Sequence, residues 1–340
     1  MITKILSPEP HNILVAAEII KQGGLAAFPT ETVYGLGADA MNVEAVKKIF
    51  AAKGRPTADP LIVHICETAQ IEMVAGKFSA EARRLAEHFW PGPLTLILPK
   101  RREVPDLVTS DLDSVAVRIP NNPVALALIR AAQTPIAAPS ANRFGHTSPT
   151  TAAHVLHDLD GRIDVILDGG PTHIGVESTV LDVSTVPARI LRPGGITREM
   201  LESVIGPVQM LKQSKKPLPG LPSPGLLEKH YAPRAEMILL RAQNSQHTLA
   251  GLAAQYTAAG KTIGVMVVDE EMSALPETGV ITFSLGSILD MAGIARKIYA
   301  GMRFLDEQHV DLILCRDFGE AGLGLAIRDR LTRAATRVIE

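Results

Sequence analysis

The chain has 340 residues, a length that favours about two domains. Its formal net charge is −2 and its aromatic content is 4%, so neither charge nor stacking surface favours stable binding to nucleic acid or to an anionic membrane. Two cysteines, Cys66 and Cys315, are too few for a disulfide framework or a four-cysteine zinc site. The start of the chain lacks a signal-peptide pattern, and its apolar runs are short, so we expect a soluble, cytoplasmic protein with no membrane partner.

The first two hundred residues alternate helical and strand-like segments. Helical spacing predicts helices, including one that Asn42 caps and one that ends in Gly23 and Gly24; they span 11–24, 43–54, 79–89 and 122–132. Apolar runs bounded by Gly, Pro or Asp predict strands at 25–29, 61–65, 94–99, 115–119, 135–140, 165–170 and 179–183. Some of these strands follow each other without room for a helix. The pattern therefore predicts an α/β fold with mixed strand directions over residues 1–205.

The composition changes near position 206. Residues 206–235 are rich in proline and lysine and lack periodicity, which predicts a linker or a lid. Residues 236–340 then read as a smaller Rossmann-like α/β domain. Its predicted strands are 236–242, 262–270, 280–286 and 311–318, and its predicted helices are 287–308 and 325–338.

Hydroxyl and guanidinium groups follow several of the predicted strands of the first domain. Residues 29–37 (PTETVYGLG) place two threonines, a carboxylate and a tyrosine on a predicted loop, and Arg118 lies inside an apolar strand, where an unpaired guanidinium would be costly. Other groups of this kind are Ser140, Asn142, Arg143, Ser148, Ser178, Thr179 and Arg192. With Lys53 and Arg55 on the loop after a helix, they predict a site for a polyanion plus a small polar molecule.

The chemistry of that site favours phosphoryl or nucleotidyl transfer. No GxSxG elbow and no Cys-His nucleophile is evident, and transfer at phosphorus needs positioning and charge neutralisation rather than a protein nucleophile. His154 and His157 lie three residues apart without a further ligand, so no metal site is predicted.

Seven ordered segments carry a resemblance to a known family: PTETVYGLG, KGRP…PLIVH, PGPLT, VAVRIP, PSAN…SPT, ESTVLD and LRPGG. They resemble the YrdC-type fold of the L-threonylcarbamoyladenylate synthases, and SPGLLEKHYAP with the unit after it resembles that family's longer, two-domain branch. The resemblance implies an open, twisted mixed sheet with a large concave site, and a Rossmann-like C-terminal domain. It also implies a nucleotidyltransferase that joins L-threonine, bicarbonate or CO2, and ATP into L-threonylcarbamoyladenylate and pyrophosphate.

The implied product is an intermediate in N6-threonylcarbamoyladenosine formation in tRNAs that read ANN codons, and a separate transferase complex would complete that modification. Residue by residue, the family's catalytic signature matches Lys53, Arg55, Ser140 and Asn142. The implied ATP contacts are Arg55, Asp59, Ser114, Ser140, Ser148, Arg192 and Tyr231. The implied threonine contacts are Thr32, His64, Arg118, Ala138 and Ser178.

Two of these assignments carry a further expectation. The carboxylate of Asp59 suits a phosphate poorly, so its backbone is the expected ATP contact, and Tyr231 is expected to fold over the nucleotide as part of the lid. We expect Mg²⁺ to arrive with ATP and to be held mainly by phosphates and water.

Two alternatives use the same residues. An RNA-binding module could grip a phosphate backbone with the same basic concavity, and its binding would fall steeply with salt. A carbamoyltransferase of the hydrogenase-maturation type shares the YrdC-type unit but carries cysteine-rich zinc motifs, which two cysteines exclude.

Overall fold

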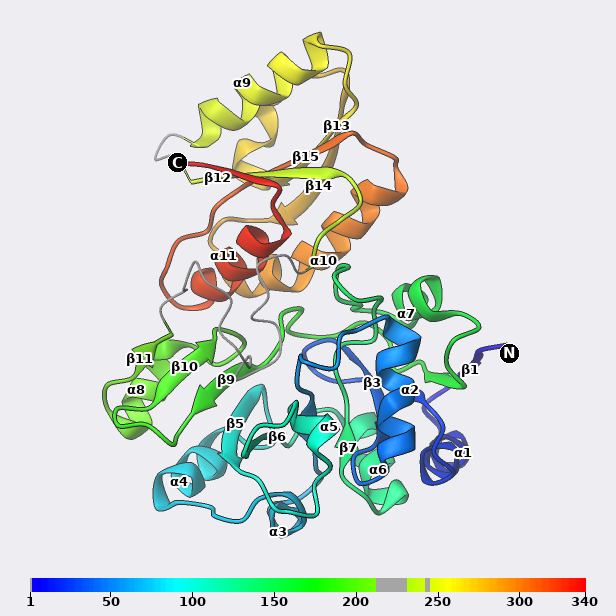
Figure 1. Ribbon diagram of the computed structural model, residues 1–340. Coiled ribbons are helices and arrows are strands. Elements are labelled where there is room, and N and C mark those ends of the chain that lie inside the picture. The colour runs from blue at the N-terminus through cyan, green and yellow to red at the C-terminus, as the bar shows by residue number, and fades with distance from the viewer. Residues whose placement is uncertain (1, 212–230, 242–244) are drawn as a thin grey trace. The chain divides into compact units, whose positions relative to one another are not determined.

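The computed structural model describes residues 2–211, 231–241 and 245–340 (Figure 1). The chain divides into two compact units. The first comprises Met1–Phe144, Ser148–His173 and Glu177–Leu226, and the second comprises Gly145–Thr147, Ile174–Val176 and Leu227–Glu340. Most of the linker or lid predicted at 206–235 lies outside the described residues, and the first residues of that stretch form strand β11 (Gln209–Met210).

The first unit is built on an 11-stranded mixed sheet with the order β1-β8-β2-β3-β7-β4-β6-β5-β9-β10-β11. Its other strands are β1 (Lys4–Leu6), β2 (Ala26–Pro29), β3 (Tyr34–Asp39), β4 (Ile62–His64), β5 (Leu94–Pro99), β6 (Ser114–Arg118), β7 (Ile136–Ala137), β8 (Val165–Leu167), β9 (Thr179–Asp182) and β10 (Arg189–Arg192). Strand β4 runs parallel to β6 and antiparallel to β7. The predicted α/β fold with mixed strand directions is confirmed.

Helices cover both faces of this sheet. They are α1 (Pro10–Lys21), α2 (Val43–Lys53), η1 (Thr68–Gln70), α3 (Ile71–Val74), α4 (Ala80–Phe89), α5 (Asp106–Thr109), α6 (Pro123–Ala132), α7 (Ala152–Leu159) and α8 (Arg198–Ile205). Ala26 and Phe28 of β2 share a core with α1 and α6, whereas Ala27 shares a separate core with α2 and α7. The alternation follows from the two-residue period of a strand, and it buries β2 on both sides.

Helix α2 carries the first charged loop of the predicted site. Asn42 caps its start, because the Asn42 side chain accepts hydrogen bonds from the backbone N–H groups of Glu44 and Ala45. Gly54 ends the helix in the left-handed conformation, with φ +64°. Both ends agree with the sequence prediction, and together they fix the direction in which the chain continues into Arg55.

Strand β3 differs from the sequence prediction, which treated residues 29–37 as a loop. In the structure the loop spans only the four residues between β2 and β3, and the strand begins at Tyr34. Gly35 and Gly37 weaken the strand signal, since glycine is rare in strand interiors. A Cβ atom on Gly37 would lie 2.7 Å from the Phe28 ring and 2.8 Å from Ile136, so the glycine permits the close packing of β3.

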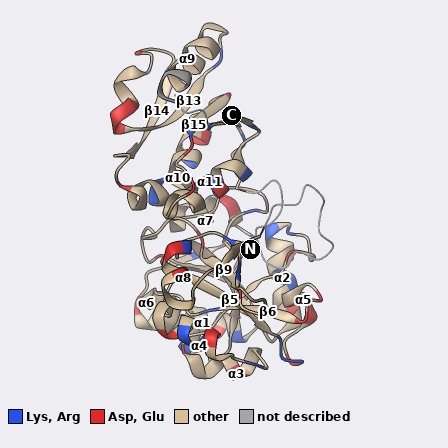
Figure 2. Ribbon diagram, turned by 90° about the vertical axis from the view of Figure 1, so that its left-hand side faces the viewer, with Lys and Arg blue, Asp and Glu red and all other residues tan. Residues whose placement is uncertain are grey.

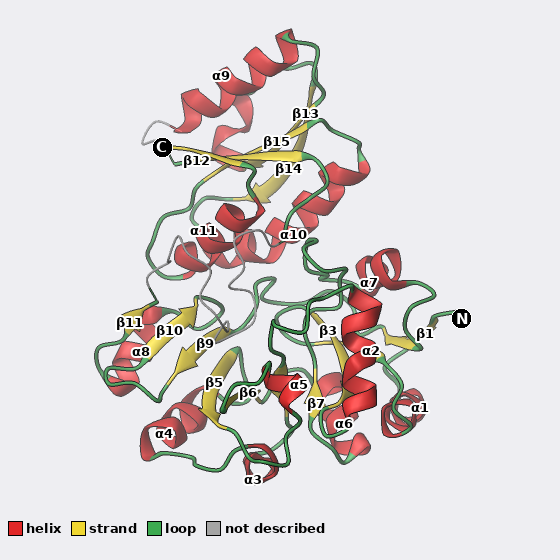
Figure 3. Ribbon diagram, in the orientation of Figure 1, coloured by secondary structure: helices red, strands yellow, loops and turns green. Residues whose placement is uncertain are grey.

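The second unit contains a parallel five-stranded sheet with the order β14-β13-β15-β12-β16. Its elements are β12 (Glu236–Leu240), α9 (Ser245–Ala258), β13 (Ile263–Val268), η2 (Asp269–Ala274), β14 (Val280–Gly286), α10 (Met291–Glu307), β15 (Leu312–Arg316), α11 (Leu323–Ala334) and β16 (Arg337–Ile339). Figure 3 shows α9 on one face of the sheet and α10 and α11 on the other. This is the doubly wound arrangement that the sequence predicted for the C-terminal domain.

Two elements of the second unit were missed by the sequence prediction. Helix α9 was not predicted, and the last predicted helix ran through residue 338, whereas α11 ends at Ala334 and Arg337–Ile339 forms edge strand β16. Strand β16 is three residues long and, among the described strands, pairs with β12 alone, so its formation depends on that neighbour and not on a local pattern.

Candidate active site

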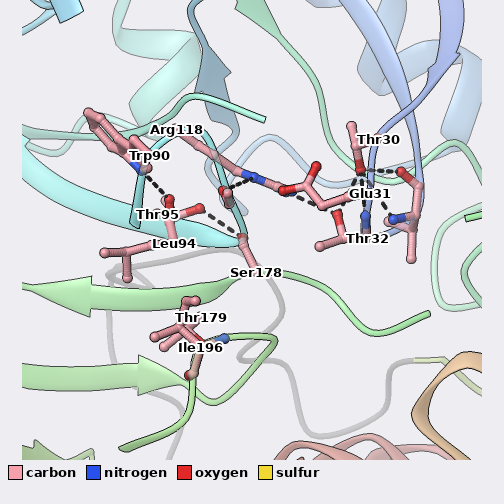
Figure 4. A network of polar contacts seen from close by, with 12 residues as sticks. Thr30, Glu31, Thr32, Trp90, Leu94, Thr95, Arg118, Ser178, Thr179 and Ile196 are labelled. Carbon is pink, nitrogen blue, oxygen red and sulfur yellow. Dashed lines mark hydrogen bonds and ion pairs between the residues drawn. The ribbon is translucent and has the colours of Figure 1, made fainter. Parts of the chain in front are cut away.

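The loop between β2 and β3 is a tight turn that Thr30 organises. Thr30 Oγ1 accepts hydrogen bonds from the backbone N–H groups of Thr32 and Val33, at 3.1 and 3.2 Å, and donates to the carbonyl of Val33 at 2.7 Å. A threonine side chain that bonds its own backbone in this way stabilises a turn. The turn holds Glu31 and Thr32 next to Arg118 (Figure 4).

Arg118, the last residue of β6, lies at the centre of the predicted threonine site. Its Nη1 donates to Thr32 Oγ1 at 3.0 Å, and its Nε donates to the carbonyl of Gly92 at 3.2 Å. Its Nη2 lies 2.7 Å from Glu31 Oε1 as an ion pair in which only 4% and 5% of the two side chains are exposed. The sequence required a partner for this guanidinium, and Glu31 is that partner.

His64, the last residue of β4, pairs in register with Arg118 of the neighbouring parallel strand. Its side chain is buried, and its ring meets that of Phe28 edge to face at 6.3 Å. Burial and then the positive charge of Arg118 lower the pKa of His64 to about 3. Within the described part of the chain, His64 Nδ1 has no hydrogen-bond partner. A neutral imidazole with a buried, unpaired nitrogen therefore lies beside the guanidinium.

This low pKa predicts how stability depends on pH. Unfolded His64 takes up a proton near its ordinary pKa of about 6.5, whereas the folded protein excludes that proton until about pH 3. The free energy of unfolding is therefore not reduced by His64 above pH 6.5. As the pH falls from 6.5 toward 3, it decreases by about 1.4 kcal/mol per pH unit. Denaturant unfolding at pH 7, 6 and 5 should show the wild type losing stability faster than His64→Gln. Parallel pH profiles for the two proteins would contradict the buried, neutral state.

Ser178 connects the predicted threonine contacts to the predicted ATP contacts. It precedes β9, and its hydroxyl shares a 2.8 Å hydrogen bond with Thr95 of β5 (Figure 4). Arg192, at the end of β10, donates from Nη2 to the carbonyl and the hydroxyl of Ser178, at 3.0 and 3.2 Å. A residue assigned to threonine therefore touches a residue assigned to the nucleotide, as a reaction between the two substrates requires.

Lys53 and the loop after β7 form a second group. Lys53 Nζ donates to the carbonyl oxygens of Ser140 and Asn142, each at 2.5 Å, so the end of α2 is tied to that loop. Burial and then the neighbouring Arg55 lower the pKa of Lys53 well below its ordinary value. A nearby polyanion would favour the charged ammonium again.

Arg55 and Asp59 form a buried ion pair, with Arg55 Nη2 at 2.9 Å from Asp59 Oδ2. Arg55 also donates to the carbonyl oxygens of Asp59 and Pro60, at 3.2 and 2.8 Å. The carboxylate that seemed a poor phosphate ligand in the sequence therefore orients the guanidinium. The predicted ATP contact at Asp59 remains a prediction.

The other predicted residues of the first unit are placed as follows. Ala138 donates its backbone N–H to the carbonyl of Ile62 at 2.9 Å, which sets it beside β4. Ser114 is the first residue of β6, at the opposite end of that strand from Arg118. Ser148 is fully buried and donates to Glu177 Oε1 at 2.7 Å.

Tyr231 belongs to the second unit. It adopts φ +65°, and its ring packs 5.7 Å from that of Tyr299. The guanidinium of Arg330, a fully buried side chain, lies 5.2 Å from the Tyr231 ring centroid. The ring of Tyr231 is thus positioned by Tyr299 and Arg330. Its predicted role over the nucleotide remains a prediction.

Thr95 and Glu177 are polar residues of this site that the sequence prediction left out, and Glu31 was counted only as the carboxylate of residues 29–37, without a role. Glu31 had a signal: an arginine in an apolar strand needs a buried acid, and residues 29–37 supply one between two threonines. Thr95 lies in an apolar strand and Glu177 precedes a serine that was singled out, so neither had a signal of its own.

The described residues form neither a metal site of clustered side chains nor a membrane-spanning helix. The ranges 2–211, 231–241 and 245–340 hold no group of three His, Cys, Asp or Glu side chains arranged to bind a metal. Among the helices of those same ranges, none combines the length and the apolar character needed to cross a bilayer.

Comparison with known proteins assigns both halves of the chain. Residues 18–194 match the Sua5/YciO/YrdC family model, described as "Telomere recombination", and residues 196–336 match the model "Threonylcarbamoyl-AMP synthase, C-terminal domain". The chain belongs to the two-domain threonylcarbamoyl-AMP synthase family. The predicted family is therefore confirmed.

Relatives of this threonylcarbamoyl-AMP synthase family match along nearly their whole length. The threonylcarbamoyl-AMP synthase of Bacillus subtilis is 46% identical over 98% of this chain and 96% of its own, and that of Pyrococcus abyssi is 44% identical over 96% and 95%. The crystal structure of P. abyssi Sua5 complexed with L-threonine superposes with a TM-score of 0.92 at 43% identity, covering 99% of this chain and 98% of that one. The fold prediction is thus confirmed for both domains.

Proposed function

We propose that the protein is the nucleotidyltransferase that converts L-threonine, CO2 or bicarbonate, and ATP into L-threonylcarbamoyl-AMP and pyrophosphate. Family membership supports this activity. The observation that carries it to this chain is a pair of buried groups on adjacent strands. Among the described residues His64 Nδ1 has no hydrogen-bond partner, and Arg118 Nη2 has the ion pair with Glu31 but no hydrogen bond. Buried polar groups without partners are rare in folded proteins, and a polar ligand satisfies them.

L-Threonine fits these groups. Arg118 would take the carboxylate, because its Nη2 contacts Glu31 as an ion pair without donating a hydrogen bond within the described residues, which leaves its N–H donors for a ligand. Thr32 accepts from Arg118, and Ser178 is drawn in the same group of polar side chains, so their hydroxyls would contact the rest of the amino acid (Figure 4). Neutral His64 can accept from the β-hydroxyl or donate to it.

ATP would lie against the second group. Lys53 and Arg55 would neutralise charge on the phosphates, with Ser140 and Asn142 supplying neutral polar contacts from the loop that Lys53 already touches. Arg192 would reach the nucleotide from the threonine side, since it contacts Ser178. Mg²⁺ would enter as part of the substrate, held mainly by phosphates and water.

The reaction then needs two bond-forming steps. The neutral amine of threonine adds to CO2, which gives a carbamate and releases a proton. A carbamate oxygen attacks the α-phosphorus of ATP, and the bond to the pyrophosphate oxygen breaks. Charge grows on the leaving pyrophosphate, where preorganised cations are most effective. No protein nucleophile takes part in this scheme.

The same activity sets the protein's expected context. The product is a mixed anhydride that water destroys, so a downstream transferase complex should consume it while modifying tRNA, in the cytoplasm where ATP and tRNA are available. Figure 2 shows lysines and arginines interspersed with acidic residues along the described chain, which gives no support to a separate RNA-binding role.

The proposal is tested by measuring pyrophosphate release from ATP, with threonine and bicarbonate each supplied or left out. Release that needs both co-substrates is the expected result. Release from ATP alone would indicate a hydrolase, and no release from folded protein under any condition would overturn the proposed function.

A further inference from the structure

Glu31 is a buried acid that the proposed reaction does not yet use. Its side chain is 5% exposed and lies in the turn that Thr30 fixes between β2 and β3. Within the described residues neither Oε1 nor Oε2 accepts a hydrogen bond, and Oε1 forms the ion pair with Arg118. An ionised carboxylate can accept about four hydrogen bonds. Glu31 therefore has most of its acceptor capacity unused in a place that excludes water.

The unused groups around Glu31 form a complementary set. Arg118 Nη2 and Glu31 Oε1 meet at 2.7 Å as an ion pair, but among the described residues neither Nη2 nor either Glu31 oxygen makes a hydrogen bond. Figure 4 shows the second Glu31 oxygen turned away from Arg118 and from Thr32. A ligand that satisfies both carries an acceptor for Arg118 and a hydrogen-bond donor for Glu31 a few bonds apart. A free α-amino acid has this pair of groups.

We propose that Glu31 binds the amino group of L-threonine while Arg118 binds its carboxylate. This inference rests on the proposed function, and it adds the residue that selects an amino acid over a plain hydroxy acid. The buried position favours such selection, because a site built for an N–H donor leaves its acceptor unpaired when the ligand lacks that donor.

The assignment also gives Glu31 a role in orientation. The ammonium, the neutral amine and the carbamate of threonine each keep at least one N–H, so one acceptor serves all three forms. An N–H directed at Glu31 leaves the amine lone pair pointing to another side, where CO2 can approach. Two side chains of opposite charge would thus orient the nitrogen: Arg118 would bind the carboxylate, and Glu31 would bind the amine.

The test compares two ligands in the full-length protein without ATP: L-threonine and (R)-3-hydroxybutanoate, which is threonine without its amino group. Glu31→Gln keeps the size of the side chain and removes its charge. We expect the Kd of threonine to rise about 10- to 100-fold, the range for a hydrogen bond to a charged group. The Kd of 3-hydroxybutanoate should change less than about threefold. Glu44→Gln is the matched control, because Glu44 is 75% exposed on α2.

Glu31→Asp provides a second variant, since it keeps the charge and draws the carboxylate back by one methylene. It too should weaken threonine more than 3-hydroxybutanoate, and it keeps the test decisive if Glu31→Gln does not fold. Equal weakening of both ligands would overturn the inference, because Glu31 would then serve only to hold Arg118. Tighter threonine binding would overturn it as well, because Glu31 would then compete with the substrate carboxylate. Failure of the wild type to bind threonine would instead refute the proposed function.

Discussion

Replacing Arg118 by lysine should lower kcat/KM for L-threonine by about 10²-fold and leave the KM for ATP nearly unchanged. Lysine keeps the charge that Glu31 needs but loses the fork that presents parallel N–H donors to a carboxylate. One lost hydrogen bond to a charged group is worth about 1.5–3 kcal/mol, or roughly one to two orders of magnitude. Initial rates of pyrophosphate release over a range of threonine concentrations measure the effect.

The alanine variant at the same position tests stability. It leaves the Glu31 carboxylate buried without a cation, which typically destabilises a protein by about 3–5 kcal/mol. Arg130→Ala, at an exposed position on α6, should change neither stability nor kinetics. A folded lysine variant with wild-type threonine kinetics would show that Arg118 is a structural residue and that the amino acid binds elsewhere.

Replacing Lys53 by methionine should reduce kcat by about 10² to 10³-fold, the range for removing one preorganised donor at developing charge. In the structure the Lys53 amine is buried, and its pKa lies well below its ordinary value. Burial of this group therefore costs the folded protein free energy. Methionine removes that desolvation but also the hydrogen bonds to the carbonyls of Ser140 and Asn142. The two changes oppose each other, and the free energy of unfolding should shift by less than about 2 kcal/mol.

The combination of lost turnover and retained stability is the signature that separates a phosphate-binding lysine from a structural one. Lys47→Met is the matched control, since Lys47 lies on the same helix with its side chain 58% exposed. Stopped turnover together with a large loss of stability would mean that Lys53 mainly ties α2 to the loop after β7. Unchanged turnover would remove Lys53 from the phosphate site.

The parts of the fold that the sequence could predict are those that local chemistry determines. Asn42 and Gly54 mark the two ends of α2, because a cap and a left-handed stop act within one helical turn. Strand β3 was missed since Gly35 and Gly37 serve close packing against Ala138 and Ile136, which lie about a hundred positions later in the chain. Helix α9 was missed since Ser, Thr and Gly dilute its helical signal, and among its residues with described burial just Leu249 and Ala253 are buried.

In the site, too, local patterns predict some features and long-range pairing determines the others. The need for a partner at Arg118 could be predicted, because a guanidinium in an apolar strand is costly alone. That this partner is Glu31, which lies 87 positions earlier, depends on the strand order and on the turn that Thr30 holds. Likewise, the contact between Ser178 and Arg192 arises from the pairing of β9 with β10, and no pattern within either segment indicates it. Composition and spacing identify the groups of a site, whereas long-range pairing decides which of them meet.

The central claim is that this chain attaches a carbamate made from threonine to AMP. The most direct measurement is mass spectrometry of the nucleotide product after a short reaction with ATP, L-threonine and ¹³C-labelled bicarbonate. The claim predicts a threonine-containing adenylate that carries the heavy carbon and forms in equal amount with pyrophosphate. A threonyl adenylate without the labelled carbon, or AMP and pyrophosphate released without any threonine adduct, would contradict it.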